Sequence, residues 1–340
     1  MILNFKLVLF YFCLGTACNF LIIYLQKFFV SKKNNQIQDI HQGNISRLGG
    51  LVIFILFFIY ASFSHFISIE IIFFMGISLF LGFLEDIGLT INPIIRLIFI
   101  FLSCFFVVSS FNLLPSFDFL ILNSFFNSQI FKYIFFTLAM ATVVNGQNII
   151  DGTNGLSAFT SVTIFTCLLF LGLVYEDIRI VQISLVIISL LIAFLVFNYP
   201  FGKVFLGDGG SYFCGFLASY LVIDIFARNP IIPTWSAVSI LFYPTLEVIF
   251  SYFRKIFQKK SPFKPDDGHL HLKLYLLISK NNRSSRLYNA LVAPFLSIVW
   301  LSPLALLPLS LELPHFAMLI TLFLVLIYCF FYYAIPKIEK

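Results

Sequence analysis

Long apolar runs, each near the length of a membrane-crossing helix, recur from one end of this chain to the other. A helix needs roughly 20 mainly apolar residues to cross the hydrocarbon of a bilayer. The runs lie at about 5–26, 48–66, 68–84, 94–111, 131–144, 156–174, 179–198, 211–227, 236–253, 287–308 and 314–335. The pattern predicts an all-α, polytopic membrane protein of about eleven spans, or ten because the fifth run is short. A barrel would show shorter, alternating segments.

Composition agrees with this fold class. Hydrophobic residues make up 60% of the chain and charged residues 11%, whereas a soluble domain is about half apolar and a quarter charged. The first run lacks a small-residue cleavage site, so we expect a span and not a cleaved signal peptide. The six cysteines lie singly in apolar stretches, which favours neither a metal site nor disulfides. We predict one integral-membrane domain over residues 1–340.

Lysine and arginine are shared unevenly between two sets of loops. Of the 21 Lys and Arg residues, 17 lie in the loops after odd-numbered runs or in the C-terminal tail, and 4 lie elsewhere. The positive-inside rule therefore predicts an N-terminus outside and a cytoplasmic C-terminus, in the cell's inner (cytoplasmic) membrane. The net charge of +6 mostly reflects this bias and attraction to anionic membrane lipids. It gives no indication of a nucleic-acid partner.

The polar clusters also fall almost entirely in the odd-numbered loops. They lie at 47–50, 85–86, 145–155, 207–211 and 266–271. Chance placement would scatter such clusters over both faces of a membrane. We therefore predict a single polar site on the cytoplasmic face, built from several loops. These loops span about 27–47, 85–96, 145–155, 199–210 and 254–286.

Two clusters are rich in carboxylates and amides. Glu85 and Asp86 adjoin at the end of the third run, and adjacent carboxylates repel unless a cation or proton compensates. They predict a Mg²⁺ or acid–base site, with a solvated helix end as the alternative. The segment 145–155 combines glycines, which let a backbone approach a ligand closely, with amides and carboxylates that suit a base, a ribose or a metal shell. Its alternative is an ordinary polar loop.

The segment 207–211 predicts a phosphate site. A glycine-rich turn that runs into a helix offers free N–H groups and a positive dipole end to a phosphate. Asp208 could hold a hard cation such as Mg²⁺ that bridges phosphate oxygens. The alternative is a plain helix start with Ser211 as N-cap.

The remaining clusters are basic. His269 and His271 are too closely spaced for the usual helical zinc pair, and suit phosphate binding or stabilisation of transition-state charge better. Inert loop histidines are the alternative. His41 and Arg47 could bind a lipid phosphate or be an ordinary positive flank.

One further ionisable residue lies inside an apolar run. Glu247 stands near the cytoplasmic end of the ninth run. Such a group is expected to pair with Arg254 or another basic side chain. Together the clusters indicate Mg²⁺-dependent phosphoryl chemistry on a lipid that enters sideways from the bilayer.

The ordered motifs resemble those of the polyprenyl-phosphate N-acetylhexosamine-1-phosphate transferases, a superfamily that includes phospho-N-acetylmuramoyl-pentapeptide transferase. Segment 41–50 resembles the family's His-x-x-Pro-Thr-Pro-Arg-x-Gly-Gly stretch, and Glu85-Asp86 its Asp-Asp pair. Segment 145–156 resembles its Asn/Asp loop and segment 205–211 its Phe-x-Gly-Asp-x-Gly-Ser turn. Segment 261–271 resembles its Ser-Pro-Phe…His-Leu-His-His loop. The resemblance covers most of the chain.

The resemblance implies a reaction. A UDP-N-acetylhexosamine, by default UDP-N-acetylglucosamine, would donate its sugar-1-phosphate to undecaprenyl phosphate and release UMP. That product would initiate a lipid-linked cell-surface glycan such as O-antigen or capsule. The cofactor would be Mg²⁺, with Mn²⁺ as an alternative.

The resemblance also implies roles for individual residues. The catalytic group would be Glu85, Asp86, Asp151, Asp208, His269 and His271, and the metal ligands Asp208 and Asp86. The substrate-binding group would be His41, Arg47, Asn145, Asn148, Asn154, Asn198, Phe205, Gly207 and Ser211.

The chain departs from the family pattern at four places. Glu85 replaces the first Asp of the pair, which keeps a carboxylate there and lengthens its reach. Residues 44–46 are Asn-Ile-Ser instead of Pro-Thr-Pro, Asn154 stands where some branches carry Asp, and Leu272 stands where many carry His.

Other functions remain as alternatives. A transporter or flippase for an anionic lipid or sugar would place charges at the bilayer midplane and in paired repeats, which this chain does not show. Phospho-N-acetylmuramoyl-pentapeptide transferase is a second alternative. An inactive scaffold would have lost Asp86, Asp151 and Asp208. The oligomeric state, monomer or homodimer, stays open.

Overall fold

The structure is a computed structural model that describes residues 4–25, 45–116, 126, 128–262, 266–279 and 286–336. Within these residues it is all-helical, without strands. The helices are α1 (Phe5–Leu25), α2 (Gly49–Ser64), α3 (Ile69–Asp86), α4 (Pro93–Ser109), α6 (Gln129–Ile149), α7 (Leu156–Val174), α8 (Ile178–Asn198), α9 (Gly207–Arg228), α10 (Thr234–Ile240), α11 (Phe242–Phe257), α12 (Leu270–Ile278), α13 (Arg286–Phe295), α14 (Ser297–Ser310) and α15 (Pro314–Ala334).

A helix lies at each predicted apolar run, with differences in length and continuity. The fifth run is not short, because α6 has 21 residues and continues into the polar segment at Asn145. The eighth begins at Gly207 and not at Ser211, so Ser211 lies in the first turn of α9 and is not its N-cap. The ninth run is two helices, α10 and α11, which bend by 79° at Leu241. Helix α12 was not predicted.

Six of the described helices are long and apolar enough to cross a membrane. They are α1, α7, α8, α9, the segment Leu287–Ser310 and α15. The bent pair α10–α11 brings the number to seven if it counts as one span. The prediction of an all-helical protein with several helices long and apolar enough to cross a membrane is therefore confirmed in this coarser form.

Helix α9 forms the centre of the bundle. The side chains of Tyr212, Phe213 and Phe216 are fully buried, and α2, α3, α6 and α7 all contact α9. Close approach at its first turn requires glycine: a Cβ on Gly82 of α3 would collide with the backbone of α9, and so would a Cβ on Gly50 of α2. These contacts fix the first turn of α9 against α2 and α3.

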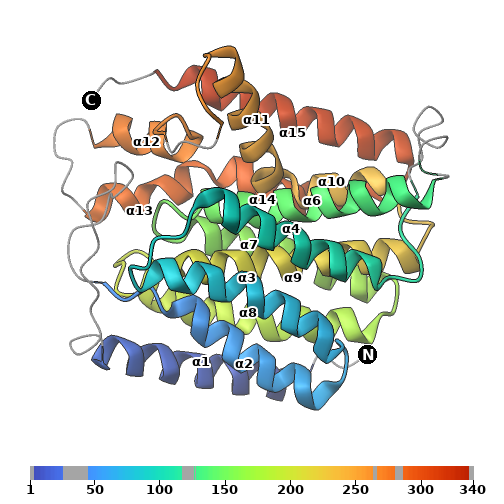
Figure 1. Cartoon of the computed structure of the whole chain (residues 1–340), viewed down its shortest axis with the longest axis horizontal. Coiled ribbons are helices and arrows are strands. Elements are labelled where there is room, and N and C mark those ends of the chain that lie inside the picture. The colour runs from blue at the N-terminus through green and yellow to red at the C-terminus, as the bar shows by residue number, and fades with distance from the viewer. Residues whose placement is uncertain are drawn as a thin grey trace.

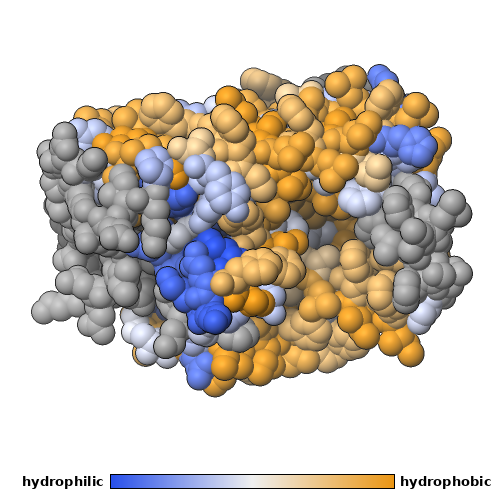
Figure 2. Space-filling view, turned by 90° about the horizontal axis from the view of Figure 1, so that it is seen from above, coloured by the Kyte–Doolittle hydropathy of each residue, from blue (hydrophilic) through white to orange (hydrophobic). Residues whose placement is uncertain are grey.

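The polar segments identified in the sequence gather at one end of the bundle, on the left in Figure 1. There the end of α3, the end of α6 and the beginning of α9 lie at the same end of the bundle as α12 (Figure 1). Seen from above, most of the surface is hydrophobic, and the main hydrophilic patch lies toward this same end (Figure 2). The one-ended arrangement positions the candidate site.

Candidate functional site

The first and fourth motifs are joined through their backbones. Gly49 donates its N–H to Phe205 O over 3.0 Å, Gly50 donates to Leu206 O over 2.9 Å, and Phe205 donates to Ser46 O over 2.9 Å. Segments about 160 residues apart thus lie side by side, as their clustering in one set of loops predicts. This pairing brings Arg47 next to the turn that begins α9.

Gly207 makes this turn possible. Its φ of 79° lies in the left-handed region, which glycine adopts without steric cost. A side chain here would also collide with the backbone oxygen of Arg47 and the carboxylate of Asp86. Within the turn, Ser211 donates its hydroxyl to Gly207 O over 2.9 Å, so its side chain is directed back along the helix.

Asp86 closes the first turn of α9 from α3. Its Oδ1 accepts the backbone N–H of Asp208 over 3.0 Å, and its Oδ2 accepts that of Gly209 over 3.1 Å. These are N–H groups that a helix start leaves without an internal partner. A carboxylate at the positive end of the helix dipole is also favourable. Asp86 therefore links two predicted motifs.

Arg96 lies between the two other carboxylates. Its guanidinium forms an ion pair with Glu85, and its Nη1 lies 3.7 Å from Asp208 Oδ2. The three side chains keep 20%, 19% and 24% of their surface accessible, respectively, so a ligand can reach them. We call Glu85, Asp86, Arg96 and Asp208 the carboxylate centre.

The loop after α6 adjoins this centre. Burial raises the pKa of Asp151 to about 8, and the nearby negative charge of Asp208 adds to the shift. Asn148 Oδ1 lies 3.5 Å from the hydroxyl of Tyr212. The guanidinium of Arg96 lies over the ring of the same tyrosine, 5.7 Å from the ring centroid. Asp151 and Asn148 thus belong to the same region as the carboxylate centre.

Three predicted amides instead make local structural contacts. Asn145 donates to Ala141 O over 2.7 Å within α6, and Asn198 donates to Val204 O over 2.8 Å. The side chain of Asn154 donates to Pro200 O over 3.1 Å. The last two hold the loop 199–204 in place. Their predicted role in nucleotide binding remains a prediction.

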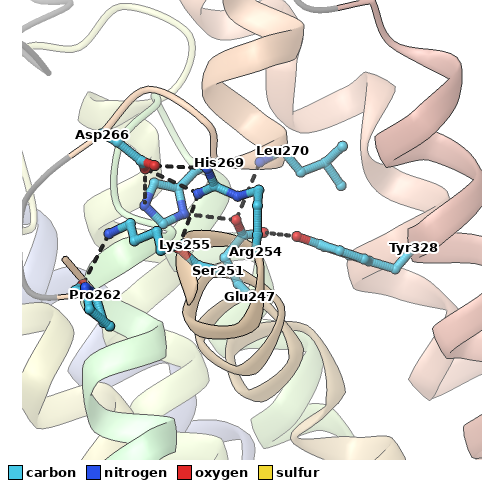
Figure 3. A network of polar contacts seen from close by, with 9 residues as sticks. All are labelled: Glu247, Ser251, Arg254, Lys255, Pro262, Asp266, His269, Leu270 and Tyr328. Carbon is cyan, nitrogen blue, oxygen red and sulfur yellow. Dashed lines mark hydrogen bonds and ion pairs between the residues drawn. The ribbon is translucent and has the colours of Figure 1, made fainter. Parts of the chain in front are cut away.

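The histidines form a second group around α11 and α12. His269 Nδ1 lies 2.9 Å from Glu247 Oε1, and its Nε2 lies 3.6 Å from Asp266 Oδ1. Arg254 donates to both oxygens of Asp266, over 2.7 and 3.1 Å. Burial by itself would raise the pKa of Asp266, but the hydrogen bonds from Arg254 outweigh this effect and lower it. We call Glu247, Arg254, Asp266, His269 and His271 the histidine centre, most of which Figure 3 shows.

The predicted partner of Glu247 is thereby decided. Of the two options, Arg254 or another basic side chain, the structure has the second: Glu247 pairs with His269, while Arg254 pairs with Asp266. The hydroxyl of Tyr328 also donates to Glu247 Oε2 over 2.9 Å (Figure 3). Sequence patterns single out Glu247 without assigning it to the site, and they do not single out Arg96 or Tyr328.

His271 connects the two centres. Its ring lies 5.9 Å from that of His269, centroid to centroid, and it packs so closely on Gly152 that a Cβ there would collide with it. Burial lowers the pKa of His271 to about 4, so its ring is neutral at ordinary pH. Because Gly152 follows Asp151, the histidine centre adjoins the loop that reaches the carboxylate centre. His41 lies outside the described residues.

Comparison with known proteins gives a family match that includes the carboxylate centre but not the histidine centre. Residues 68–226 match the model of glycosyl transferase family 4. The matched region contains the whole carboxylate centre and Asp151, whereas the histidine centre and Arg47 lie outside it.

Curated relatives of the chain are named as sugar-phosphate transferases. A probable undecaprenyl-phosphate N-acetylglucosaminyl 1-phosphate transferase of Bacillus subtilis is 29% identical over 170 residues, 47% of this chain and 47% of the relative. An undecaprenyl-phosphate alpha-N-acetylglucosaminyl 1-phosphate transferase of Thermotoga maritima is 33% identical over 138 residues, 41% of each chain. A phospho-N-acetylmuramoyl-pentapeptide-transferase of Leuconostoc mesenteroides is 32% identical over 138 residues, 41% of this chain and 42% of the relative.

These matches cover less than half of the length of each relative. The resemblance to the transferase superfamily inferred from the motifs is nevertheless confirmed, since the matched residues 68–226 contain three of the five segments that carried it, at 85–86, 145–156 and 205–211.

Proposed function

We propose that this protein transfers N-acetylhexosamine-1-phosphate, by default N-acetylglucosamine-1-phosphate, from a UDP-sugar to undecaprenyl phosphate and releases UMP. The observation that carries the proposal is the joining of Asp86 to the first turn of α9, because it brings Glu85, Arg96 and Asp208 together at a glycine-rich helix start. The names of the relatives favour this reaction over the pentapeptide transferase. The product would initiate a lipid-linked cell-surface glycan.

The carboxylate centre suits Mg²⁺. Within the described residues, no group of three or more His, Cys, Asp or Glu side chains forms a complete metal cage. Mg²⁺ commonly binds through one or two carboxylates and completes its shell with water and substrate phosphates. Asp208 and Glu85, both partly accessible, fit that mode. The resemblance implies Asp86 as the second ligand, but both oxygens of Asp86 accept N–H groups of α9, so we propose Glu85 in its place. When bound, Mg²⁺ would neutralise charge on the donor's pyrophosphate.

The chain's own groups would supply the remaining chemistry. Arg96 provides positive charge for a phosphate between Glu85 and Asp208, and Arg47 adds a second cation beside the same turn. In phosphoryl transfer, positioning and charge neutralisation are the main contributions of a protein. The neutral ring of His271 and the ring of His269 would hydrogen-bond phosphate oxygens from the adjoining centre.

An apolar hollow supports a lipid acceptor. It has a volume of about 690 Å³ and is bordered by α2, α3 and α4, with Gly76, Phe80 and Leu81 among its lining residues. On α3 its residues recur at helical spacing along one stripe, and one further turn along this stripe brings Leu84 and Glu85. We assign to this hollow part of the prenyl chain, with the phosphate of the acceptor at the carboxylate centre.

The proposal extends to membrane topology. Eleven spans, with the N-terminus outside and the motif loops and C-terminus in the cytoplasm, would place both centres where a cytoplasmic UDP-sugar meets a membrane lipid. The grouping of the polar segments at one end of the bundle supports this topology (Figure 1). The same proposal places the protein in the cytoplasmic membrane.

The test is a reconstituted transfer reaction. Purified protein receives undecaprenyl phosphate, Mg²⁺ and one member of a panel of UDP-sugars, and UMP release is measured together with the lipid-linked product. We expect release with at least one UDP-N-acetylhexosamine, dependent on the lipid phosphate. Folded protein that releases no UMP with any sugar would overturn the proposal, and the panel identifies the sugar.

A further inference from the structure

Glu247 receives hydrogen bonds from three directions, although it lies inside an apolar segment. His269 approaches its Oε1 over 2.9 Å, the backbone N–H of Leu270 donates to the same oxygen over 3.3 Å, and Tyr328 donates to Oε2 over 2.9 Å. The side chain is 1% exposed. Burying a carboxylate is costly unless it is paired and hydrogen-bonded. The three hydrogen bonds therefore offset the cost of burying this carboxylate, and they fix its position.

The three donors come from two separate parts of the fold, the start of α12 and the helix α15. His269 is the N-cap residue of α12, Leu270 is the first residue of that helix, and Tyr328 lies on α15. Glu247 thus accepts an N–H that the start of α12 would otherwise leave unpaired. Through one side chain, α11 fixes both the position of α12 and the ring of its N-cap residue.

The chemistry of the pair determines where the imidazole carries its proton. An ionised carboxylate only accepts hydrogen bonds, so the ring nitrogen that faces Glu247 must be protonated. That nitrogen is Nδ1. The opposite nitrogen, Nε2, lies 3.6 Å from Asp266 Oδ1, which is beyond hydrogen-bonding distance, and Asp266 is itself engaged by Arg254. Nε2 is left as the atom with which His269 can bind a ligand.

We propose that Glu247 is the positioning residue of His269: it keeps a proton on Nδ1 and directs Nε2 to the site, while Tyr328 holds Glu247 in place. The catalytic consequence rests on the proposed transferase function, in which His269 Nε2 contacts a substrate phosphate. The structural statement, that Glu247 sets the protonated nitrogen of His269, stands independently of that function.

The first measurement needs no activity. Protein labelled with ¹⁵N in its histidines is studied by NMR in detergent micelles, and His269→Gln identifies the His269 signals among the five histidines. We expect a protonated Nδ1 in the unchanged protein. In Glu247→Ala the ring loses its acceptor, and we expect the proton to move to Nε2 in most molecules. An unchanged Nδ1–H signal in folded Glu247→Ala would overturn the proposal.

The second measurement is kinetic. We expect Glu247→Ala to lower kcat about 10²-fold, the usual cost of losing one aligned transition-state contact, and to change KM for the UDP-sugar about threefold or less. Glu247→Gln retains an oxygen for Nδ1–H and an amide for the Tyr328 hydroxyl, so we expect kcat within about tenfold of the unchanged protein. Equal losses in the Gln and Ala variants, with equal ring signals, would contradict positioning through Nδ1.

Two further variants separate positioning from instability. Tyr328→Phe removes one of the three donors and leaves the His269 contact, so Nδ1 should remain protonated and kcat should fall about fivefold. Glu70→Gln makes the same chemical change as Glu247→Gln at an exposed position on α3, and should change neither readout. If the unchanged protein shows the Nδ1–H signal but no transfer, the transferase proposal fails and the positioning assignment stands.

Discussion

The carboxylate of Asp86, at the end of α3, accepts the backbone N–H of Asp208, at the beginning of α9, over 3.0 Å. With the second hydrogen bond from Gly209, it supplies the partners that the first turn of α9 needs. It also fixes the distance between the Glu85-Asp86 pair and the glycine-rich turn. A residue that sequence motifs suggest as a metal ligand is thus, in the folded chain, also a helix cap.

Replacing Asp86 should affect stability and activity together. We expect Asp86→Ala to destabilise the protein by about 1–2 kcal/mol, because it removes a helix cap, and to abolish most transfer because α9 would shift relative to Glu85. Thermal unfolding and UMP release measure the two effects. Asp177→Ala is the control, since Asp177 caps α8 by accepting from Arg179 and Ile180. It should lose stability and retain activity.

Asp208→Asn should abolish turnover while leaving the fold intact. The amide keeps the shape of the side chain but loses the charge that would attract Mg²⁺ and hold it against phosphate oxygens. UMP release is measured over a range of Mg²⁺ concentrations. Asp224→Asn makes the same change on the same helix, where Asp224 pairs with Arg179 and Arg228, and should stay active. Wild-type-like activity of Asp208→Asn would remove Asp208 from the metal site.

Arg96→Lys should lower transfer about tenfold or more. A planar guanidinium can contact Glu85 and Asp208 at once, whereas an ammonium group is a point charge that does not reproduce this fork. The ion pair of Arg179 with Asp224, outside the proposed site, offers a matched comparison in Arg179→Lys. A selective loss in Arg96→Lys supports a role in phosphate binding. Equal activity of the two variants would contradict it.

The raised pKa of Asp151 predicts a pH dependence of stability. Its pKa is about 8 in the folded protein and about 4 in an unfolded chain, so folding favours the protonated form. The associated stability is complete below about pH 4 and is lost as pH rises through about 8. We expect Asp151→Asn, which resembles the protonated form, to gain thermal stability relative to the unchanged protein as pH rises from about 5 to 9. A constant difference across this range would contradict the assignment.

Two glycines on α3 offer a test of helix packing. A Cβ on Gly82 would collide with the backbone of Gly209, whereas one on Gly76 would meet only the end of the Phe54 ring, at 3.4 Å. We expect Gly82→Ala to cost about 1–3 kcal/mol, as overpacking does, and to reduce activity. Gly76→Ala should be tolerated or slightly stabilising, since alanine favours helix. Thermal unfolding of the two variants decides.

Much of the helical framework follows from the sequence, because each apolar run is long enough to require a helix. The breaks do not follow. The apolar pattern continues across Leu241, where α10 and α11 bend by 79°. The bend could not be predicted, because the composition of a continuous hydrophobic segment does not show where its helix axis changes direction. Helix α12 was missed because it is short and lies in a segment that its charges mark as a loop.

The site was predictable at the level of motifs and not of contacts. Glycines and carboxylates in the segments around Asp86 and Asp208 indicated phosphate chemistry, and the structure brings these segments together. Arg96 could be taken only as one of many positive-inside charges, although its place in the first turn after Asn92 and Pro93, close to Glu85, was a usable signal. That Asn145 and Asn198 bond to backbone carbonyls depends on side-chain direction, which a motif does not specify.

The hydrogen bond from Asp208 to Asp86 joins residues separated by 122 positions in the chain. During translation, α3 is therefore synthesised long before α9, the helix whose first turn hydrogen-bonds to Asp86. Until α9 is in place, the nascent protein lacks Asp208 of the carboxylate centre. The carboxylate of Asp86 then also lacks the backbone N–H groups that it accepts in the folded protein. Assembly in the membrane is thus ordered: the chemically important corner forms late, and chains that stop short of α9 cannot acquire it.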